Sequence, residues 1–376
     1  MQTEKDEGKG VATSQFASIA AKHAVSKIKQ PHPLRGLFGT LRIMINNNIK
    51  IMGNIVDWNK FKQASDDERV QILKEGAEKG DAEAQFLLGI RCYFGKAVPV
   101  DYTEARKWFL LAAEQGNTDA QFNIGAMYKR GEGVPQDISE AMRWYRMSAE
   151  HGNRRAQYYL GICSDVNNDY SEALHWYKLA AEQGLADAQD RLGHMYVHGE
   201  GVPVDYTEAR KWFLLAAEQG DADAQCNLGV MYANGDGVPQ DISEAMRWCR
   251  MSAEQGFRFA QCYMGNMYFE GDGVEKDYTE AFYWYKLAAE QGEAHSQDYL
   301  GEMYLNGYGC SVDYSEAMRL FLLSSEQGNP EADYDIGTMY EEGKGVERNI
   351  ALAKEWYQKA AEKGYEDANS ALERLK

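Results

Sequence analysis

Apolar and polar residues follow a helical period along most of the chain. In residues 101–116, alanine and aromatic side chains recur at three- and four-residue spacing, which predicts a helix with one apolar face. Asp101 and Glu104 stand at its start with the spacing of a capping box, and Gly116 predicts its end. The same sixteen residues return unchanged at 205–220. One such helix cannot bury its apolar face alone, so the pattern predicts a stack of helices.

Looser copies of this segment divide the chain into repeats, each predicted to contain two helices. A turn with the pattern Gly-x-Gly-Val joins the two helices in most repeats, but the third repeat lacks it. A glycine in the middle of every first helix costs about 1 kcal/mol of helix propensity, so we expect it to permit close approach of the paired helix. Seven repeats have 36 residues and the third has 32; they span 81–116, 117–152, 153–184, 185–220, 221–256, 257–292, 293–328 and 329–364. The predicted fold class is all-α, built from helix-turn-helix repeats.

The ends of the chain depart from the repeat pattern. Residues 1–57 form a basic leader, predicted to be partly disordered or an amphipathic helix. Residues 58–80 form an N-terminal capping half-repeat, in which Ser65 and Glu68 predict another capping box. Residues 365–376 predict a C-terminal capping helix.

The repeat consensus resembles a known pattern. It reads A-x-x-x-L-G-x-M-Y-x-x-G-x-G-V for the first helix and turn, and A-x-x-W-Y-x-x-A-A-x-x-G for the second helix. This is similar to the Sel-one-like repeat of the tetratricopeptide-repeat superfamily, although Leu320 replaces the tryptophan in the seventh repeat. The resemblance implies a right-handed α-solenoid that acts as an adaptor. Relatives hold proteins together in signalling, cell-envelope regulation, membrane-associated quality control or host interaction, without catalytic residues of their own.

A longer period favours a scaffold over an enzyme. Residues 98–116 equal residues 202–220, and 134–152 match 238–256 at all but two positions, so repeats one to three were copied as a block. Block copying lengthens a solenoid without designing a new site. No nucleophile motif, phosphate loop or paired-carboxylate site stands out, and we therefore expect no enzyme activity and no cofactor.

The sixth position of each repeat varies while the packing positions do not, and we expect it to face the concave groove of the solenoid. Three successive aromatic residues there would form an exposed apolar strip that binds a partner protein or peptide. Alternatively, these rings fold back and pack between helices. If they are exposed, Phe122→Ala weakens partner binding and leaves thermal stability nearly unchanged. The residues predicted to contact a partner are Phe86, Phe122, Tyr158, Phe259, Phe269 and Tyr334.

One constellation has the residue types of a zinc site. Asp190, His194 and His198 are spaced by four residues on a predicted first helix, and Cys226 lies at the place in the next repeat that corresponds to Asp190. The span from Asp190 to His198 is about 12 Å along a helix, too long for one ion to use all three. A site made by the two histidines and Cys226 is geometrically easier, but we expect surface histidines and no metal.

The net charge of −18 is unevenly distributed. Residues 1–57 carry eight basic and four acidic side chains, which leaves −22 for residues 58–376. An acidic array repels phosphate backbones, so nucleic acid is not an expected partner. The acidic surface is either a solvated face, an attractant for a basic partner, or a dock for the chain's own leader.

Within the leader, residues 34–56 have helical apolar spacing. One interpretation is that they pack on the first repeat or are partly disordered. Alternatively, they hold the protein at an anionic membrane surface or serve as an organelle-targeting leader.

Six cysteines occupy different repeat positions, so they predict free thiols in a reducing compartment. No apolar run is long enough for a transmembrane helix, and the N-terminus lacks the pattern of a secretory signal. The expected location is cytoplasmic, with delivery into a host cell or peripheral membrane association left open. The expected assembly is a monomer.

Overall fold

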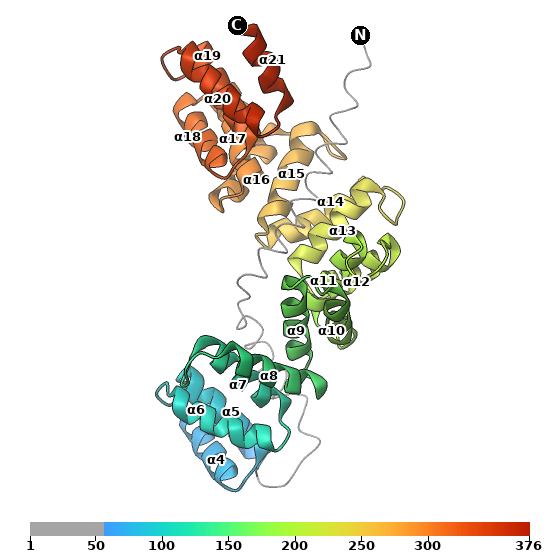
Figure 1. The fold of residues 1–376 in the computed structure, drawn as a ribbon, viewed down its shortest axis with the longest axis vertical. Helices are drawn as coiled ribbons and strands as arrows, with labels where there is room; N and C mark the ends of the chain where they lie inside the picture. The colour runs from blue at the N-terminus through green and yellow to red at the C-terminus, as the bar shows by residue number, and fades with distance from the viewer. Residues whose placement is uncertain (1–55) are drawn as a thin grey trace. The chain divides into compact units, whose positions relative to one another are not determined.

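The structure is a computed structural model, and it describes residues 56–376. These residues are all-α: they form helices joined by short turns, and within each of the two bodies named below consecutive helices lie side by side (Figure 1). They fall into two compact bodies, which we call the N-terminal body (residues 56–205) and the C-terminal body (residues 206–376). The predicted membrane-surface segment, residues 34–56, lies almost wholly outside the described residues and stays a prediction, as do the boundaries drawn for the leader and the caps.

The N-terminal body contains a short helix, a capping helix and the helices of the first three and a half repeats. Its helices are α3 (Trp58–Gln63), α4 (Asp66–Glu78), α5 (Ala82–Phe94), α6 (Tyr102–Glu114), α7 (Thr118–Arg130), α8 (Ile138–Glu150), α9 (Arg154–Val166), α10 (Tyr170–Glu182) and α11 (Ala186–His198).

The C-terminal body contains the remaining repeats and a closing helix. Its helices are α12 (Tyr206–Glu218), α13 (Ala222–Asn234), α14 (Ile242–Glu254), α15 (Arg258–Glu270), α16 (Tyr278–Glu290), α17 (Ala294–Asn306), α18 (Tyr314–Glu326), α19 (Pro330–Glu342), α20 (Ile350–Glu362) and α21 (Glu366–Arg374). Both helices of each of the eight predicted repeats are therefore confirmed, and the seven pairs that lie within one body pack in succession as in an α-solenoid.

The mid-helix glycines have the packing role that was predicted for them. A Cβ atom added at Gly125 of α7 would lie 2.9 Å from the ring of Tyr145, which comes from the paired helix α8. At Gly265 of α15 the corresponding distance to the ring of Tyr285 in α16 is 2.5 Å. Both rings are almost fully buried. The helix-propensity cost of these two glycines is therefore offset by a large aromatic side chain packed directly on the helix backbone, and at Gly229 the smaller Cys249 takes the place of the ring.

A buried glutamine joins each of the first seven repeats to the helix before it, and Asp333 replaces this glutamine in the eighth repeat. In the third repeat, Gln157 Nε2 donates to the carbonyl oxygen of Ala149 at the end of α8, at 3.0 Å. Its own Oε1 accepts from Gln183 Nε2 at the end of α10, at 2.7 Å. The carbonyl group at a helix end would otherwise lack a partner, so this glutamine satisfies the end of one repeat while it positions the next.

The predicted capping boxes differ between the first cap and the repeats. At Ser65 the box is complete: Ser65 Oγ accepts from the Glu68 backbone N–H, and Glu68 Oε2 accepts from the Ser65 backbone N–H at 2.8 Å. At Asp101 only half forms, because the Asp101 N–H instead donates to the carbonyl oxygen of Cys92 at 2.9 Å. Glu104, left without that donor, pairs with a lysine one turn later in α6. The prediction of a full box at Asp101 was therefore wrong, since the inter-helix turn already uses the N–H.

The short third repeat uses a different turn. Asn168 adopts a left-handed backbone conformation with φ of 60°, whereas the other repeats use two glycines for their left-handed turn residues, or Gly95 and Ala97 in the first repeat. Asp165, at the end of α9, accepts two hydrogen bonds from Arg191 of α11, at 2.9 and 3.0 Å, and one from the Tyr177 hydroxyl at 3.1 Å. This buried ion pair fixes the repeat that lacks the glycine turn.

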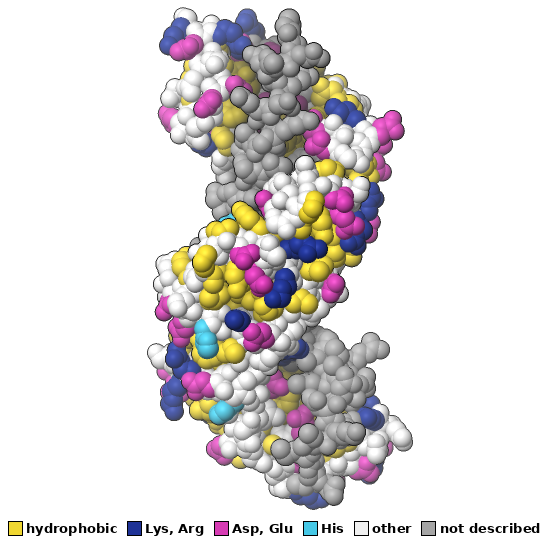
Figure 2. Space-filling model, turned by 90° about the vertical axis from the view of Figure 1, so that its right-hand side faces the viewer, with side chains coloured by type: hydrophobic (Ala, Val, Ile, Leu, Met, Phe, Trp, Pro, Cys, Tyr) yellow, Lys and Arg dark blue, Asp and Glu magenta, His cyan; other side chains and the backbone are white. Residues whose placement is uncertain are grey.

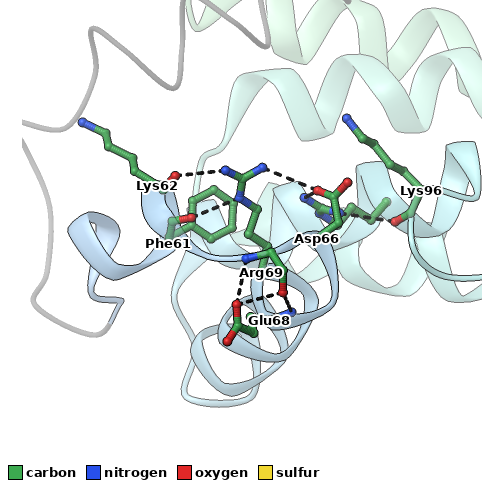
Figure 3. Close-up of polar contacts among 8 residues, drawn as sticks. Phe61, Lys62, Asp66, Glu68, Arg69 and Lys96 are labelled. Atoms are coloured by element: carbon green, nitrogen blue, oxygen red, sulfur yellow. Dashed lines mark hydrogen bonds and ion pairs between the residues drawn. The ribbon is translucent and has the colours of Figure 1, made fainter.

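The N-terminal cap is held by arginine side chains (Figure 3). The Arg69 guanidinium donates to the carbonyl oxygens of Phe61 and Lys62, at 3.1 and 3.0 Å, and so ties α3 to α4. Asp66 at the start of α4 pairs with Arg91 of α5 at 3.5 Å. The capping helix is therefore joined to the first repeat by polar contacts as well as by its apolar face.

Candidate partner-binding surface

Within the N-terminal body, first helices and second helices lie on different sides of the stack. The Asp165–Arg191 pair joins neighbouring first helices, α9 and α11, and an Arg146–Glu172 contact of 3.4 Å joins neighbouring second helices, α8 and α10. We call the side made by the first helices the first-helix face and the other side the second-helix face. The predicted contact residues belong to the first-helix face.

The exposed aromatic strip predicted at the sixth position does not form as expected. Phe86 and Phe122 are each only 6% exposed. The Phe122 ring lies 5.3 Å from that of Tyr145, and the Phe86 ring lies 6.0 Å from that of Phe109, each in the second helix of the same repeat. Tyr158 packs in the same way but stays partly exposed. The rings fold back because the mid-helix glycine, three residues later, leaves room for the partner ring that they cover.

The other three predicted contact residues divide similarly. Phe259 is buried, while Phe269 and Tyr334 are partly exposed. Tyr334 packs between the rings of Tyr357 and Tyr365, near the last helix. The contact of these six residues with a partner stays a prediction. For the three buried residues, such a contact also requires a structural change that exposes the ring.

The histidines considered for zinc are largely engaged with each other and with Asp190. His194 is buried, its Nε2 atom lies 3.7 Å from Asp190 Oδ2, and its ring stacks on that of His198 at 6.1 Å. Burial lowers the pKa of His198. Cys226 is buried in α13 of the C-terminal body. Over residues 56–376, no group of three His, Cys, Asp or Glu side chains has an arrangement that could hold a metal ion.

Three aspartates in the described part of the chain are at least nine-tenths buried, and they differ in their partners. Asp165 is paired with Arg191, as described above. Asp333 in α19 accepts from Lys359 Nζ at 2.8 Å and is also paired with Lys363. Asp298 in α17 is only 7% exposed, yet its Oδ1 atom has no hydrogen-bond partner, and no described cation pairs with it. Burying a carboxylate without a cation is costly, so Asp298 stands out.

Asp298 lies in an acidic environment on the first-helix face. Burial raises its pKa well above the usual range, and nearby Asp335, Glu331 and Glu302 raise it further. Burial, with Glu302 and Glu331 close by, raises the pKa of Asp335 to about 7. Glu302, Glu331 and Asp335 are partly exposed, so they form the accessible border of this group. We call these four carboxylates the Asp298 cluster.

The sequence also indicates this acidic cluster, although a comparison of the sixth positions alone does not reveal it. Asp298 occupies the sixth position of its repeat, which the sequence predicts to face the concave groove of the solenoid. Asp298 and Glu302 are four residues apart, as are Glu331 and Asp335 in the next repeat, so each pair lies on one side of its helix. Two such pairs in successive repeats predict one acidic patch.

On the face shown in Figure 2, Lys and Arg side chains lie interspersed with Asp and Glu side chains. All six cysteines lie in the described part, and none forms a disulfide. Across residues 56–376, no helix is both long enough and apolar enough to cross a membrane.

Comparison with known proteins identifies the repeats. The family model described as Sel1 repeat matches eight consecutive segments, one residue later than the divisions drawn from the sequence: 82–117, 118–153, 154–185, 186–221, 222–257, 258–293, 294–329 and 330–365. No curated protein matches the chain.

Two solved structures are similar over most of the chain. One is a protective antigen present in uropathogenic Escherichia coli strains that displays an SLR fold; it is 38% identical over 81% of this chain, with a TM-score of 0.72, and this chain spans 66% of its length. The other is a Sel1 repeat protein from Oxalobacter formigenes, 31% identical over 85% of this chain and 89% of its own, with a TM-score of 0.59. With eight matched repeats, the chain belongs to the Sel1 repeat family.

Proposed function

We propose that this protein is a scaffold that binds a partner protein or peptide through its first-helix face and so acts as an adaptor or regulator. Sel1 repeat arrays are scaffolds that generally mediate protein interactions, and no catalytic domain was found in the chain. The first-helix face corresponds to the side predicted from the sequence to be the concave groove of the solenoid.

One observation supports this proposal above the others. Most positions that pack the helix pairs, such as the mid-helix glycines, hold the same kind of side chain in repeat after repeat, as do the linking glutamines of the first seven repeats. The sixth position, by contrast, holds phenylalanine, tyrosine, aspartate or cysteine. A constant framework that presents varied side chains on one face suits recognition of a single partner along several repeats.

The test is affinity purification of the tagged full chain from its native cell, followed by mass spectrometry. The informative variant is Arg155→Glu, because Arg155 lies on the first-helix face and is only partly buried. The matched control is Arg143→Glu in α8, whose side chain is 74% exposed on the second-helix face. Both variants change the net charge by the same amount, so a difference in partner capture between them shows which face binds the partner.

We expect a partner that is captured by the wild-type chain and by Arg143→Glu and is lost or reduced with Arg155→Glu. Loss with Arg143→Glu alone would transfer the interface to the second-helix face. Failure of every form to capture a partner would count against the scaffold role. The membrane-surface alternative depends on residues 34–56 and would then be tested by co-sedimentation of the full chain with anionic vesicles.

A further inference from the structure

We propose that the Asp298 cluster binds a lysine or arginine side chain from a basic segment of the partner protein. This inference rests on the proposed scaffold function and names the chemistry of one contact within it. The cluster consists of Asp298 and Glu302 on α17 and of Glu331 and Asp335 on α19.

The first argument is that the Asp298 carboxylate lacks the partner that comparable carboxylates in this chain possess. Asp333 is fully buried and is neutralised by two lysines of α20, and Asp165 is neutralised by the Arg191 guanidinium. The chain thus satisfies buried aspartates with ammonium or guanidinium groups when they serve the fold. The same groups are the chemical complement of Asp298, whose Oδ1 atom accepts no hydrogen bond.

The second argument is that the site is both acidic and accessible. Glu302, Glu331 and Asp335 stay partly exposed beside the buried aspartate, so an incoming side chain meets negative charge before it reaches Asp298. Nearby carboxylates raise one another's affinity for protons, and a fixed cation would relieve the same repulsion. A long, flexible lysine or arginine side chain can bury its methylene groups while its charged end reaches a recessed carboxylate.

A divalent metal is a less suitable occupant. Over residues 56–376 no three acidic, histidine or cysteine side chains are arranged to hold a metal ion. A side-chain cation needs no such convergence, because one or two direct hydrogen bonds to carboxylate oxygens suffice. The source is taken to be the partner rather than the chain itself, since the array carries a large negative charge that attracts basic proteins.

The experiment measures binding of a fluorescein-labelled oligolysine peptide to the full chain by fluorescence polarisation. It is done at about 0.15 M salt, where charges more than about 8 Å apart are largely screened. Asp298→Asn is compared with Glu326→Gln, which removes one negative charge from an exposed position at the end of α18. Thermal unfolding of both variants is measured in parallel.

We expect Asp298→Asn to weaken oligolysine binding by about tenfold or more, because a charge-assisted hydrogen bond in a buried site is lost. Glu326→Gln should change it by less than about twofold. The thermal midpoint of Asp298→Asn should stay the same or rise, since the raised pKa of Asp298 favours a neutral carboxyl group in the free protein, and the asparagine amide is likewise neutral. Equal effects of the two variants on binding, or a clear fall in thermal midpoint for Asp298→Asn, would overturn the proposal.

Carbodiimide cross-linking of the same mixture identifies the source of the cation. An amide bond between oligolysine and a carboxylate of the Asp298 cluster, found by mass spectrometry, supports a site open to a partner. A bond from these carboxylates to a lysine of residues 8–56 would instead give the site to the chain's own leader and overturn the assignment to a partner. If the captured partner binds Asp298→Asn as well as wild type, this inference fails while the scaffold function stands.

Discussion

Substitution of Phe122 by alanine distinguishes a packing role from a contact role at the sixth position. Phe122 is 6% exposed and belongs to a cluster that includes Tyr145, Ala141 and Leu160. Removing a buried phenylalanine ring typically costs about 3–5 kcal/mol, and part of this cost is the aromatic contact with Tyr145. For a body of this size, 1 kcal/mol corresponds to about 2–4 °C, so we expect a fall of roughly 10 °C in thermal midpoint.

The assay is thermal and urea unfolding of the full chain, followed by far-ultraviolet circular dichroism. Tyr283→Ala is the control, because Tyr283 lies on the second helix α16 and is 53% exposed. Surface substitutions of this kind change stability by about 0.5 kcal/mol or less. A Phe122→Ala shift no larger than that of Tyr283→Ala would refute the packing role and restore Phe122 as an exposed contact residue.

Three further predictions concern glycine packing, the buried ion pair and pH. Gly265→Ala should lower the urea midpoint, because its new Cβ atom would lie 2.5 Å from the ring of Tyr285, and overpacking of about 1–3 kcal/mol exceeds the gain of about 1 kcal/mol in helix propensity. Arg191→Met should destabilise by about 3–5 kcal/mol in urea unfolding, because it leaves Asp165 buried without its cation. Thermal stability should fall between about pH 4 and about pH 7, that is, between the ordinary pKa of an aspartate and the raised pKa of Asp335. The pKa of Asp335 is raised to about 7 in the folded state, so its stabilising contribution is present at low pH and is lost as the pH rises through that value; Asp335→Asn should flatten the dependence.

Each of these predictions has a matched control. Arg247→Met breaks an ion pair with Glu244 whose side chains are both more than one-third exposed, and it should cost about 1 kcal/mol or less. Gly265→Ala combined with Tyr285→Leu should lose less than the sum of the two single changes, since the clash needs the ring. Equal costs for Arg191→Met and Arg247→Met, additive glycine and tyrosine effects, or stability that rises with pH would contradict the corresponding argument.

The repeat pattern predicted the helices and their pairing because residues that pack the two helices together return at the same positions along the array. A glycine opposite an aromatic ring, such as Gly125 opposite Tyr145, appears in the sequence as a constant glycine column beside a column that is aromatic in all repeats but the fifth, which has Cys249. At Asp101, by contrast, the sequence predicts a complete capping box, of which only half forms. The sequence shows the side chains of a cap, but it does not show that the Asp101 N–H already donates to Cys92.

The candidate surface was harder to predict because it depends on what lies beside each side chain. The sixth position of each repeat lies on a first helix. Its spacing alone does not distinguish a ring that packs within its own repeat, such as Phe122, from a ring that is exposed to a partner. Asp298 occupies the same column as Phe122, and only its lack of a partner distinguishes it from Asp165 and Asp333. That difference is set by residues in other helices, which a single column does not contain.

Hydroxyl-radical footprinting of the full chain with its captured partner tests the central claim most directly. The account predicts that partly exposed first-helix side chains, such as Tyr159 and Tyr299, lose labelling in the complex. Exposed side chains of second helices, such as Met251 and Tyr283, should keep theirs. Protection of Met251 and Tyr283 with unchanged labelling of Tyr159 and Tyr299 would contradict binding through the first-helix face.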